Sequence, residues 1–260
     1  MVSVRCQQVG KSFGQRSTAK EVLAAVDCVV EEGEFVSLLG PSGCGKSTLL
    51  MMVAGLEPIT RGRIYAGDRL VEAPLADIGI VFQDPTLLPW RTTLANVLFP
   101  IDVMRRPRAD DVARARGLLD LVGLGDAADA RPRQLSGGMR QRAAICRALV
   151  TDPRLLLMDE PFSALDAITR DEMGLVLLDL WERYRKTVLF VTHSIPEAVL
   201  LSDRVLVMGG KPSRIIEDLR IPFPRPRDGA VVRTQAFHAL CDHLHAQIHH
   251  AKALDQPTPN

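Results

Sequence analysis

The sequence predicts an α/β protein, and three observations support this fold class. Continuous apolar runs, typical of strands buried on both faces of a sheet, occur at Phe35–Leu39, Leu155–Met158 and Thr187–Val191. Segments whose apolar residues recur at helical spacing lie between these runs. Strands that alternate with helices in this way are expected to form a sheet covered by helices.

The first half of the chain supplies most of the expected strands. Val2–Val9 and Val22–Val30 alternate well enough to be strands, and we expect them to be antiparallel. Phe35–Leu39 leads into a helix over Lys46–Ala54, which ends before a glycine. Ile78–Phe82 is a further buried strand.

A helical insertion is expected from Thr93 to about Thr151. Apolar residues at helical spacing between Val112 and Val122 predict one helix, and Gly138–Val150 predicts another. Strands then return, with a long helix between the runs at 155–158 and 187–191. The last expected elements are a strand at Val205–Met208, a proline-rich linker at Ile221–Arg227 and a helix near Thr234–Ala253.

Composition excludes several classes of protein. The 260 residues carry a net charge of +1, so the overall charge does not point to nucleic-acid binding. The five cysteines form no CxxC pair, which fits a reducing compartment rather than a disulfide scaffold. No apolar run approaches the roughly 18 residues needed to span a bilayer. Any contact with a membrane is therefore expected to go through a partner.

A phosphate-binding loop is predicted at Gly40–Ser47, "GPSGCGKS", which matches G-x-x-x-x-G-K-[ST] between a strand and a helix. Lys46 should reach the β- and γ-phosphates of ATP, and the Ser47 hydroxyl should hold Mg²⁺. A thiolate at Cys44 could sense oxidation, but a small space-filling side chain is the favoured interpretation. The candidate nucleotide-binding residues here are Gly40, Pro41, Ser42, Gly43, Cys44, Gly45, Lys46, Ser47 and Thr48.

Two adjacent carboxylates follow the buried run at 155–158. Ligands bind at the carboxyl ends of strands in open α/β sheets, which is where Asp159 and Glu160 are expected. Asp159 would face Mg²⁺, while Glu160 would act as general base toward the attacking water. A solvated acidic turn is the weaker alternative, because four apolar residues precede the pair.

A second glycine-rich segment, "QLSGGMRQR" at Gln134–Arg142, also opens a predicted helix. Ser136 would cap this helix, whose N-terminus attracts anions. Because Gly40–Ser47 already fills the phosphate site of its own chain, the second segment is expected to serve the nucleotide of another molecule.

Together these motifs resemble the ATP-binding subunit of ABC transporters over roughly residues 1–220. The resemblance implies a P-loop NTPase (RecA-like) core with an antiparallel β subdomain and an inserted helical subdomain at about 88–152. The remaining 221–260 would be a linker and helix. The residues that carry the resemblance are Gly40–Ser47, Gln83, Leu135–Arg142, Leu155–Glu160, Ser163–Asp166 and His193.

The resemblance further implies an ATPase that works as a head-to-tail dimer of two copies with two ATP molecules between them. Each ATP would contact one copy's Lys46 loop and the Ser136, Gly137 and Gly138 of the other. Phe13 would stack on adenine, unless it is a core aromatic. The other implied roles are Mg²⁺ and water contact for Gln83, γ-phosphate contact for His193, and organisation of the dimer seam for Asp166.

Three segments resemble the nitrate/sulfonate/taurine branch of bacterial importers: "LLPWRTTLANV" at 87–97, "FSALDAITRDEM" at 162–173 and "PRPRD" at 224–228. An importer subunit of this kind would lie at the cytoplasmic face of the inner membrane. It would energise uptake of a small anion such as taurine, an aliphatic sulfonate or nitrate. Leu87, Leu88 and Trp90 would dock the permease rather than pack internally, and a solute-binding protein would be an indirect partner.

Two rival functions are an ABC-type ATPase acting on DNA or ribosomes, and a nucleotide-binding regulator without turnover. The chain lacks the coiled-coil arms or tandem cassettes of the first, and Glu160 and His193 argue against the second. In the tail, Cys241, His245 and His249 could bind Zn²⁺. The favoured interpretation is that the histidines cover the polar side of an apolar helical stripe formed by Phe237, Leu240, Leu244, Ile248 and Ala251.

Overall fold

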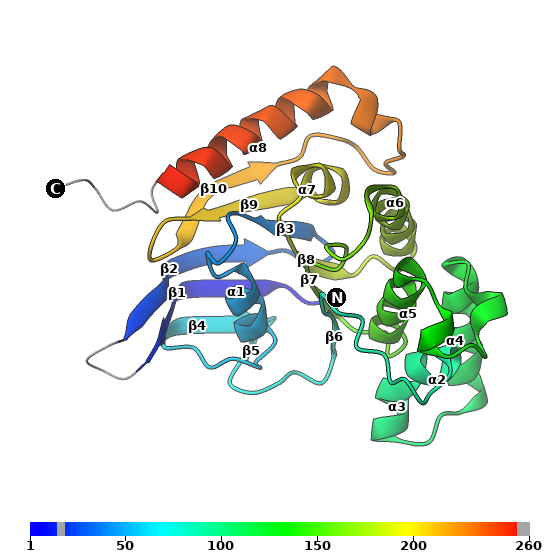
Figure 1. The fold of residues 1–260 in the computed structure, drawn as a ribbon. Helices are drawn as coiled ribbons and strands as arrows, with labels where there is room; N and C mark the ends of the chain where they lie inside the picture. The colour runs from blue at the N-terminus through cyan, green and yellow to red at the C-terminus, as the bar shows by residue number, and fades with distance from the viewer. Residues whose placement is uncertain (15–18, 254–260) are drawn as a thin grey trace. The chain divides into compact units, whose positions relative to one another are not determined.

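The computed structural model describes residues 1–14 and 19–253 (Figure 1). By its internal contacts the chain divides into two compact units. The first unit joins Met1–Ala76 to Thr187–Asn260, and the second is Asp77–Lys186. No helix in the described part of the chain is long and apolar enough to cross a membrane.

The first unit contains a four-stranded sheet in the order β2-β1-β4-β5. β1 (Val4–Phe13) pairs antiparallel with β2 (Lys20–Val30), which confirms the pair expected from the alternating sequence. On its other side β1 pairs with β4 (Arg61–Ala66), and β5 (Arg69–Leu70) continues the sheet. We did not expect β4 and β5 from the sequence, because their polar composition gives no apolar pattern.

The first unit also holds the buried strands that lead to the site. β3 (Phe35–Leu39) pairs in parallel with β8 (Thr187–Thr192) and with β9 (Arg204–Gly209), and β10 (Arg214–Arg220) pairs antiparallel with β9. Every residue of β3, β8 and β9 is buried, as continuous apolar runs require. Phe35 of β3 and Phe190 of β8 pack against each other with ring centroids 5.7 Å apart.

A helix follows β3 and another follows β8, each after a short connection. α1 (Lys46–Val53) follows the loop after β3, and α7 (Ile195–Leu201) follows the turn after β8. After the short helix η3 (Val231–Arg233), α8 (Gln235–Ala253) contacts β9 and α7 (Figure 1). Phe237, Leu244 and Ala251 of α8 are buried, which confirms the apolar stripe and leaves its histidines on the exposed side.

The second unit is mainly helical, as expected from the helical insertion that the sequence predicts. Its two strands, β6 (Ile78–Val81) and β7 (Leu155–Asp159), are parallel. β6 alternates buried and half-buried residues, so it is less enclosed than its apolar sequence suggested. The helices are α2 (Thr93–Val97), α3 (Phe99–Met104), α4 (Ala109–Leu121), η1 (Gly125–Ala127), η2 (Pro132–Gln134), α5 (Gly137–Leu149) and α6 (Ala167–Tyr184). Among them, α5 contacts α2, α4, α6 and β6, so it is the central helix of this unit.

Candidate functional site

The loop Gly40–Ser47 connects β3 to α1, and its glycines are required by the backbone. A Cβ at Gly40 would lie 2.4 Å from the Met208 carbonyl oxygen. Gly43 and Gly45 have φ of 79° and 97°, in the left-handed region that favours glycine. The loop therefore has the conformation in which successive amides can converge on an anion.

Lys46 and Cys44 lie on the inner side of this loop. The Lys46 ammonium donates hydrogen bonds to the carbonyls of Gly40 and Pro41, both at 2.9 Å, and its side chain is buried. Cys44 is also buried, which agrees with a space-filling role. Ser47 is an exposed residue in the first turn of α1.

Two more candidates belong to the first unit. Phe13 ends β1 and is 44% exposed, so it is not a core aromatic; the Lys11 ammonium lies 4.7 Å from its ring centroid. His193 follows β8 directly and is exposed. Its neighbour Ser194 is the N-cap of α7 and accepts from the Glu197 amide. His193 therefore lies in a short turn between a buried strand and a capped helix.

Asp159 and Glu160 lie in the second unit at the carboxyl end of β7, where the sequence placed them. Both are half-buried. Glu160 has φ of 44°, a left-handed conformation that is uncommon for a residue with a side chain. Its carbonyl accepts from the Ser163 amide at 3.2 Å and the Ser163 hydroxyl at 2.9 Å. These bonds hold the turn in which the chain changes direction between Asp159 and Glu160.

The second glycine-rich segment forms the N-terminus of α5. Ser136 is its N-cap and accepts from the Met139 amide at 3.2 Å, as predicted. Ser136 and Gly137 are exposed. A Cβ at Gly138 would lie 2.6 Å from the Thr169 Cγ2, so α5 contacts α6 too closely there for a larger residue. The first turn of α5 thus presents backbone amides at an exposed helix end.

Gln83 and this helix end share a hollow of about 410 Å³ in the second unit. Its lining also includes Arg140, Gln141 and the loop after Glu160, at Pro161, Ala164 and Leu165. The structure therefore brings Gln83 and Gly137 to one surface depression.

Asp166, also exposed, caps α6 by accepting from the Thr169 amide at 3.0 Å and hydroxyl at 2.7 Å; these hydrogen bonds lower the pKa of its carboxyl.

Two residues of α5 to which the sequence assigned no role of their own, Arg147 and Gln141, hold the Gln83 loop. The Arg147 guanidinium donates to the carbonyls of Pro85 at 2.7 Å and Thr86 at 3.0 Å, and burial lowers its pKa. The buried Gln141 amide donates to the Phe82 carbonyl at 3.4 Å. Their position on the same helix as Ser136 was visible in the sequence, but nothing there indicated which loop they contact.

The predicted docking residues follow Gln83 along the chain. Trp90 is 70% exposed, whereas Leu87 and Leu88 are half-buried, so internal packing does not account for the tryptophan. The buried Asn96 side chain holds this loop by bonding both the amide of Leu88 at 2.7 Å and its carbonyl at 3.1 Å. Val103 and Met104 of α3 are also exposed, at 68% and 72%.

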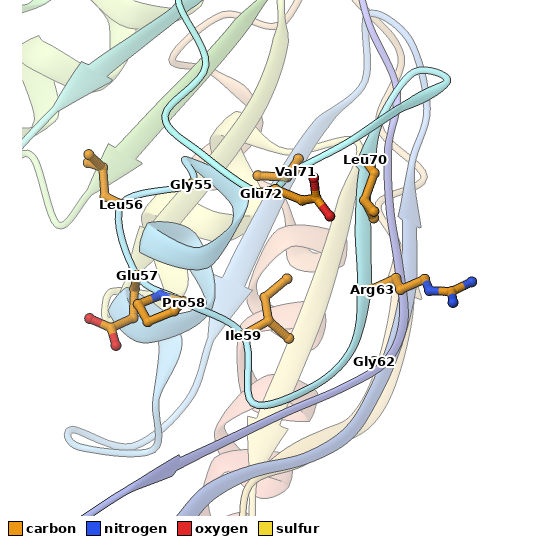
Figure 2. A pocket seen from close by; sticks show the side chains of 10 residues that line it. All are labelled: Gly55, Leu56, Glu57, Pro58, Ile59, Gly62, Arg63, Leu70, Val71 and Glu72. Carbon is orange, nitrogen blue, oxygen red and sulfur yellow. The ribbon is translucent and has the colours of Figure 1, made fainter.

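Neither the tail histidines nor a second hollow adds to these candidates. Among the described residues, no three His, Cys, Asp or Glu side chains are placed to hold a metal ion, and Cys241, His245 and His249 do not form such a group. A hollow of about 460 Å³ lies between the segment after α1 and strands β4 and β5 (Figure 2). Ile59, Leu70 and Val71 line it, and it contains no predicted nucleotide-binding residue.

Comparison with known proteins agrees with this arrangement. Residues 23–163 match the family model described as ABC transporter. The chain is 42% identical to a taurine import ATP-binding protein of Pseudomonas aeruginosa, with 86% of each chain covered. It is 44% identical to a bicarbonate transport ATP-binding protein of Synechocystis, with 85% of this chain and 80% of that protein covered. A solved dimeric ATP-binding cassette bound to ADP and Pi has a TM-score of 0.74 and 33% identity, over 85% of this chain and all of that one. The chain therefore belongs to the ABC transporter family and is one of its ATP-binding ATPases, of the branch that contains nitrate, sulfonate and taurine importers.

Proposed function

We propose that this protein is the ATP-hydrolysing subunit of an importer for a small anion, and that two copies bind two ATP molecules between them. The observation that carries the proposal is the exposed N-terminus of α5. Ser136 caps it, Gly137 is open to solvent, and the chain has a separate phosphate loop at Gly40–Ser47. A helix end that offers amides to an anion is explained when a second copy supplies the γ-phosphate.

The site residues then divide the work by their chemistry. Lys46 and the loop amides bind the phosphates, and Phe13 stacks on adenine. Ser47, Asp159 and Gln83 each offer an oxygen of the kind that Mg²⁺ prefers, and a Mg²⁺ ion held by them would neutralise charge on the phosphates. Glu160 accepts a proton from the attacking water, and His193 contacts the γ-phosphate. Asp166 fixes the start of α6 at the dimer seam.

The transported solute is proposed from the relatives. The two relatives are named for taurine, which carries a sulfonate, and for bicarbonate; both solutes are small and have an anionic group, which supports a cargo of this kind here. Selectivity belongs to the permease and solute-binding partners. Co-purification of the permease, followed by measurement of taurine, sulfonate, nitrate and bicarbonate uptake in vesicles, tests this part of the proposal. Uptake of none of these anions by an otherwise active transporter would contradict it.

The dimer is tested with Glu160→Gln, which removes the base but keeps the size of the side chain. We expect hydrolysis to fall by about 10²–10⁴-fold. Because bound ATP then persists, light scattering should show a dimer with MgATP and a monomer without it. Adding Ser136→Arg to this variant should abolish the dimer while ATP still binds, because the larger cation blocks the helix end.

Two results would contradict the proposal. A Glu160→Gln protein that stays monomeric with saturating MgATP would show that the α5 terminus does not join two copies. A wild-type turnover per molecule that does not change with protein concentration would show that one copy contains a complete site.

A further inference from the structure

The proline-rich segment at 221–227 contains two arginines that the proposed function leaves unused. The Arg227 side chain is only 2% exposed and lies at the C-terminal end of α7. The two N–H groups of its Nη1 are shared among the carbonyls of Ser202 at 2.6 Å, Leu200 at 3.0 Å and Val199 at 3.4 Å. A buried cation with three carbonyl acceptors at one helix end is a specific structural contact.

Arg225 completes the same helix end. It donates to the Leu201 carbonyl and, through Nε at 3.0 Å, to the Asp203 carboxylate. The Ala198 carbonyl already accepts from the Ser202 amide at 3.2 Å. Every carbonyl from 198 to 202 therefore has a donor, although the last turn of α7 contains no basic residue of its own. The tail supplies the cations that complement a helix C-terminus.

The opposite end of α7 carries the turn that contains His193. The Thr192 hydroxyl donates to the Glu197 carboxylate at 2.7 Å and accepts from the Ser194 amide at 2.9 Å. This network ties the turn to the first residues of the helix. Since α7 has seven residues, the two ends are only about 10 Å apart. A shift at the C-terminal end would therefore move the His193 turn.

Asp203 extends the same contact to β3, the strand that leads to the phosphate loop. Its carboxylate accepts from the Phe35 amide at 2.9 Å, and its own amide donates to the Phe35 carbonyl at 2.8 Å. Arg225 thus bonds a residue that is fixed to the start of β3. The two arginines therefore connect the start of β3 with the C-terminal end of α7. The opposite ends of these two elements lead to Gly40 and carry His193, respectively.

We propose that Arg225 and Arg227 are positioning residues for ATP hydrolysis, which clamp the C-terminal end of α7 so that the His193 turn keeps a fixed place. This proposal rests on the proposed function, in which His193 contacts the γ-phosphate. It assigns a role in turnover to the segment "PRPRD", whose residues are otherwise remote in sequence from every nucleotide-binding motif. The clamp acts through His193, so neither arginine needs to touch ATP.

The test uses the full-length chain with Arg227→Gln, and Arg225→Gln as a second variant whose side chain is less buried. Arg233→Gln, which changes an exposed arginine of η3 shortly after this segment, is the matched control. We expect kcat to fall about tenfold in both clamp variants, because small misplacements of a contact group are costly, while KM for MgATP stays nearly constant. The control should hydrolyse ATP at the wild-type rate.

Two readouts separate positioning from a general loss of stability. Amide exchange should become faster in residues 192–201 but stay unchanged in α1. In a His193→Ala background, Arg227→Gln should change the remaining rate by less than about twofold, because both changes remove the same interaction. If the remaining rate is too low to measure, the comparison of amide exchange in residues 192–201 and in α1 tests the proposal instead.

Three results would contradict the clamp. The first is wild-type turnover in both arginine variants when His193→Ala is slow. The second is amide exchange that rises as much in α1 as in residues 192–201, and the third is a double variant whose loss of rate equals the two single losses combined. A His193→Ala protein with wild-type turnover would instead contradict the role of His193 in the proposed function. The two failures are therefore distinguishable.

Discussion

At the scale of single residues, the backbone of Glu160 is held in a conformation that its side chain disfavours. Its φ of 44° falls in the left-handed region, where a residue with a Cβ is strained by about 1–3 kcal/mol. The hydrogen bonds from Ser163 to its carbonyl hold the turn in place. Strain of this kind persists where function requires a particular direction for a side chain.

This strain can be measured by comparing Glu160→Gly with Glu160→Ala. Both variants lose the carboxylate, so both should lose hydrolysis. Glycine adopts the left-handed conformation without a Cβ penalty, so we expect Glu160→Gly to be more stable than Glu160→Ala by up to about 1 kcal/mol in denaturant unfolding. A less stable glycine variant would show that the turn is not strained at this residue.

Asp111, in the first turn of α4, predicts a dependence of stability on pH. Hydrogen bonds from the Arg105 side chain and the Arg108 amide lower the pKa of its carboxyl from 3.8 to about 2. Because the folded state favours the ionised form, the stabilisation is fully present above pH 4 and is lost as pH falls toward 2.

Asp111→Asn should therefore unfold more easily than the wild type at pH 7, and the difference should shrink below pH 4. Thermal unfolding between pH 7 and pH 2.5 measures it, with Asp110→Asn as the control from the same turn. A difference independent of pH would mean that the ionised carboxyl is not what stabilises the helix start.

At the scale of elements, α5 connects two parts of the candidate site. Its N-terminus presents Ser136 and Gly137, and its Arg147 holds the loop that follows Gln83. Arg147→Ala should lower turnover several-fold without changing ATP affinity, because Gln83 loses its fixed place while Lys46 does not. ATPase assays and ATP titration measure both, and the exposed Arg116→Ala is the control. Equal turnover in the two variants would exclude this role for Arg147.

The sequence predicted elements wherever one local pattern decides the structure. β3 is continuous and apolar, and its bounds are as expected; Ser136 and the glycines of Gly40–Ser47 are required by local backbone geometry. β4 and β5 were missed because polar strands show no apolar period. Arg147 and Arg227 were missed for another reason. Arg147 bonds carbonyls 61 and 62 residues away, and the α7 carbonyls that Arg227 bonds are 25–28 residues away, so only the folded structure shows these partners.

At the scale of the whole molecule, the unit of residues 77–186 presents exposed apolar side chains on the loop after Gln83 and on α3. Trp90, Val103 and Met104 are each more than two-thirds exposed, and the buried Asn96 makes the tryptophan loop rigid. Rigid, exposed aromatic residues are frequent anchors of protein interfaces. In the proposed transporter the partner is the membrane permease, which must sense whether Gln83 contacts nucleotide.

Trp90→Ala should separate ATP chemistry from transport. The isolated variant should bind ATP like the wild type, because Trp90 takes part in no predicted nucleotide contact. Its affinity for the permease should fall by about 30-fold or more, the effect of losing an anchor worth about 2 kcal/mol. Pull-down of the detergent-solubilised permease and solute uptake in vesicles measure the loss, and Leu175→Ala, a half-exposed residue of α6, is the control. Normal co-purification and transport by Trp90→Ala would show that the permease docks on another surface. Loss of ATP binding together with loss of permease binding would show that the tryptophan supports the fold of its own unit.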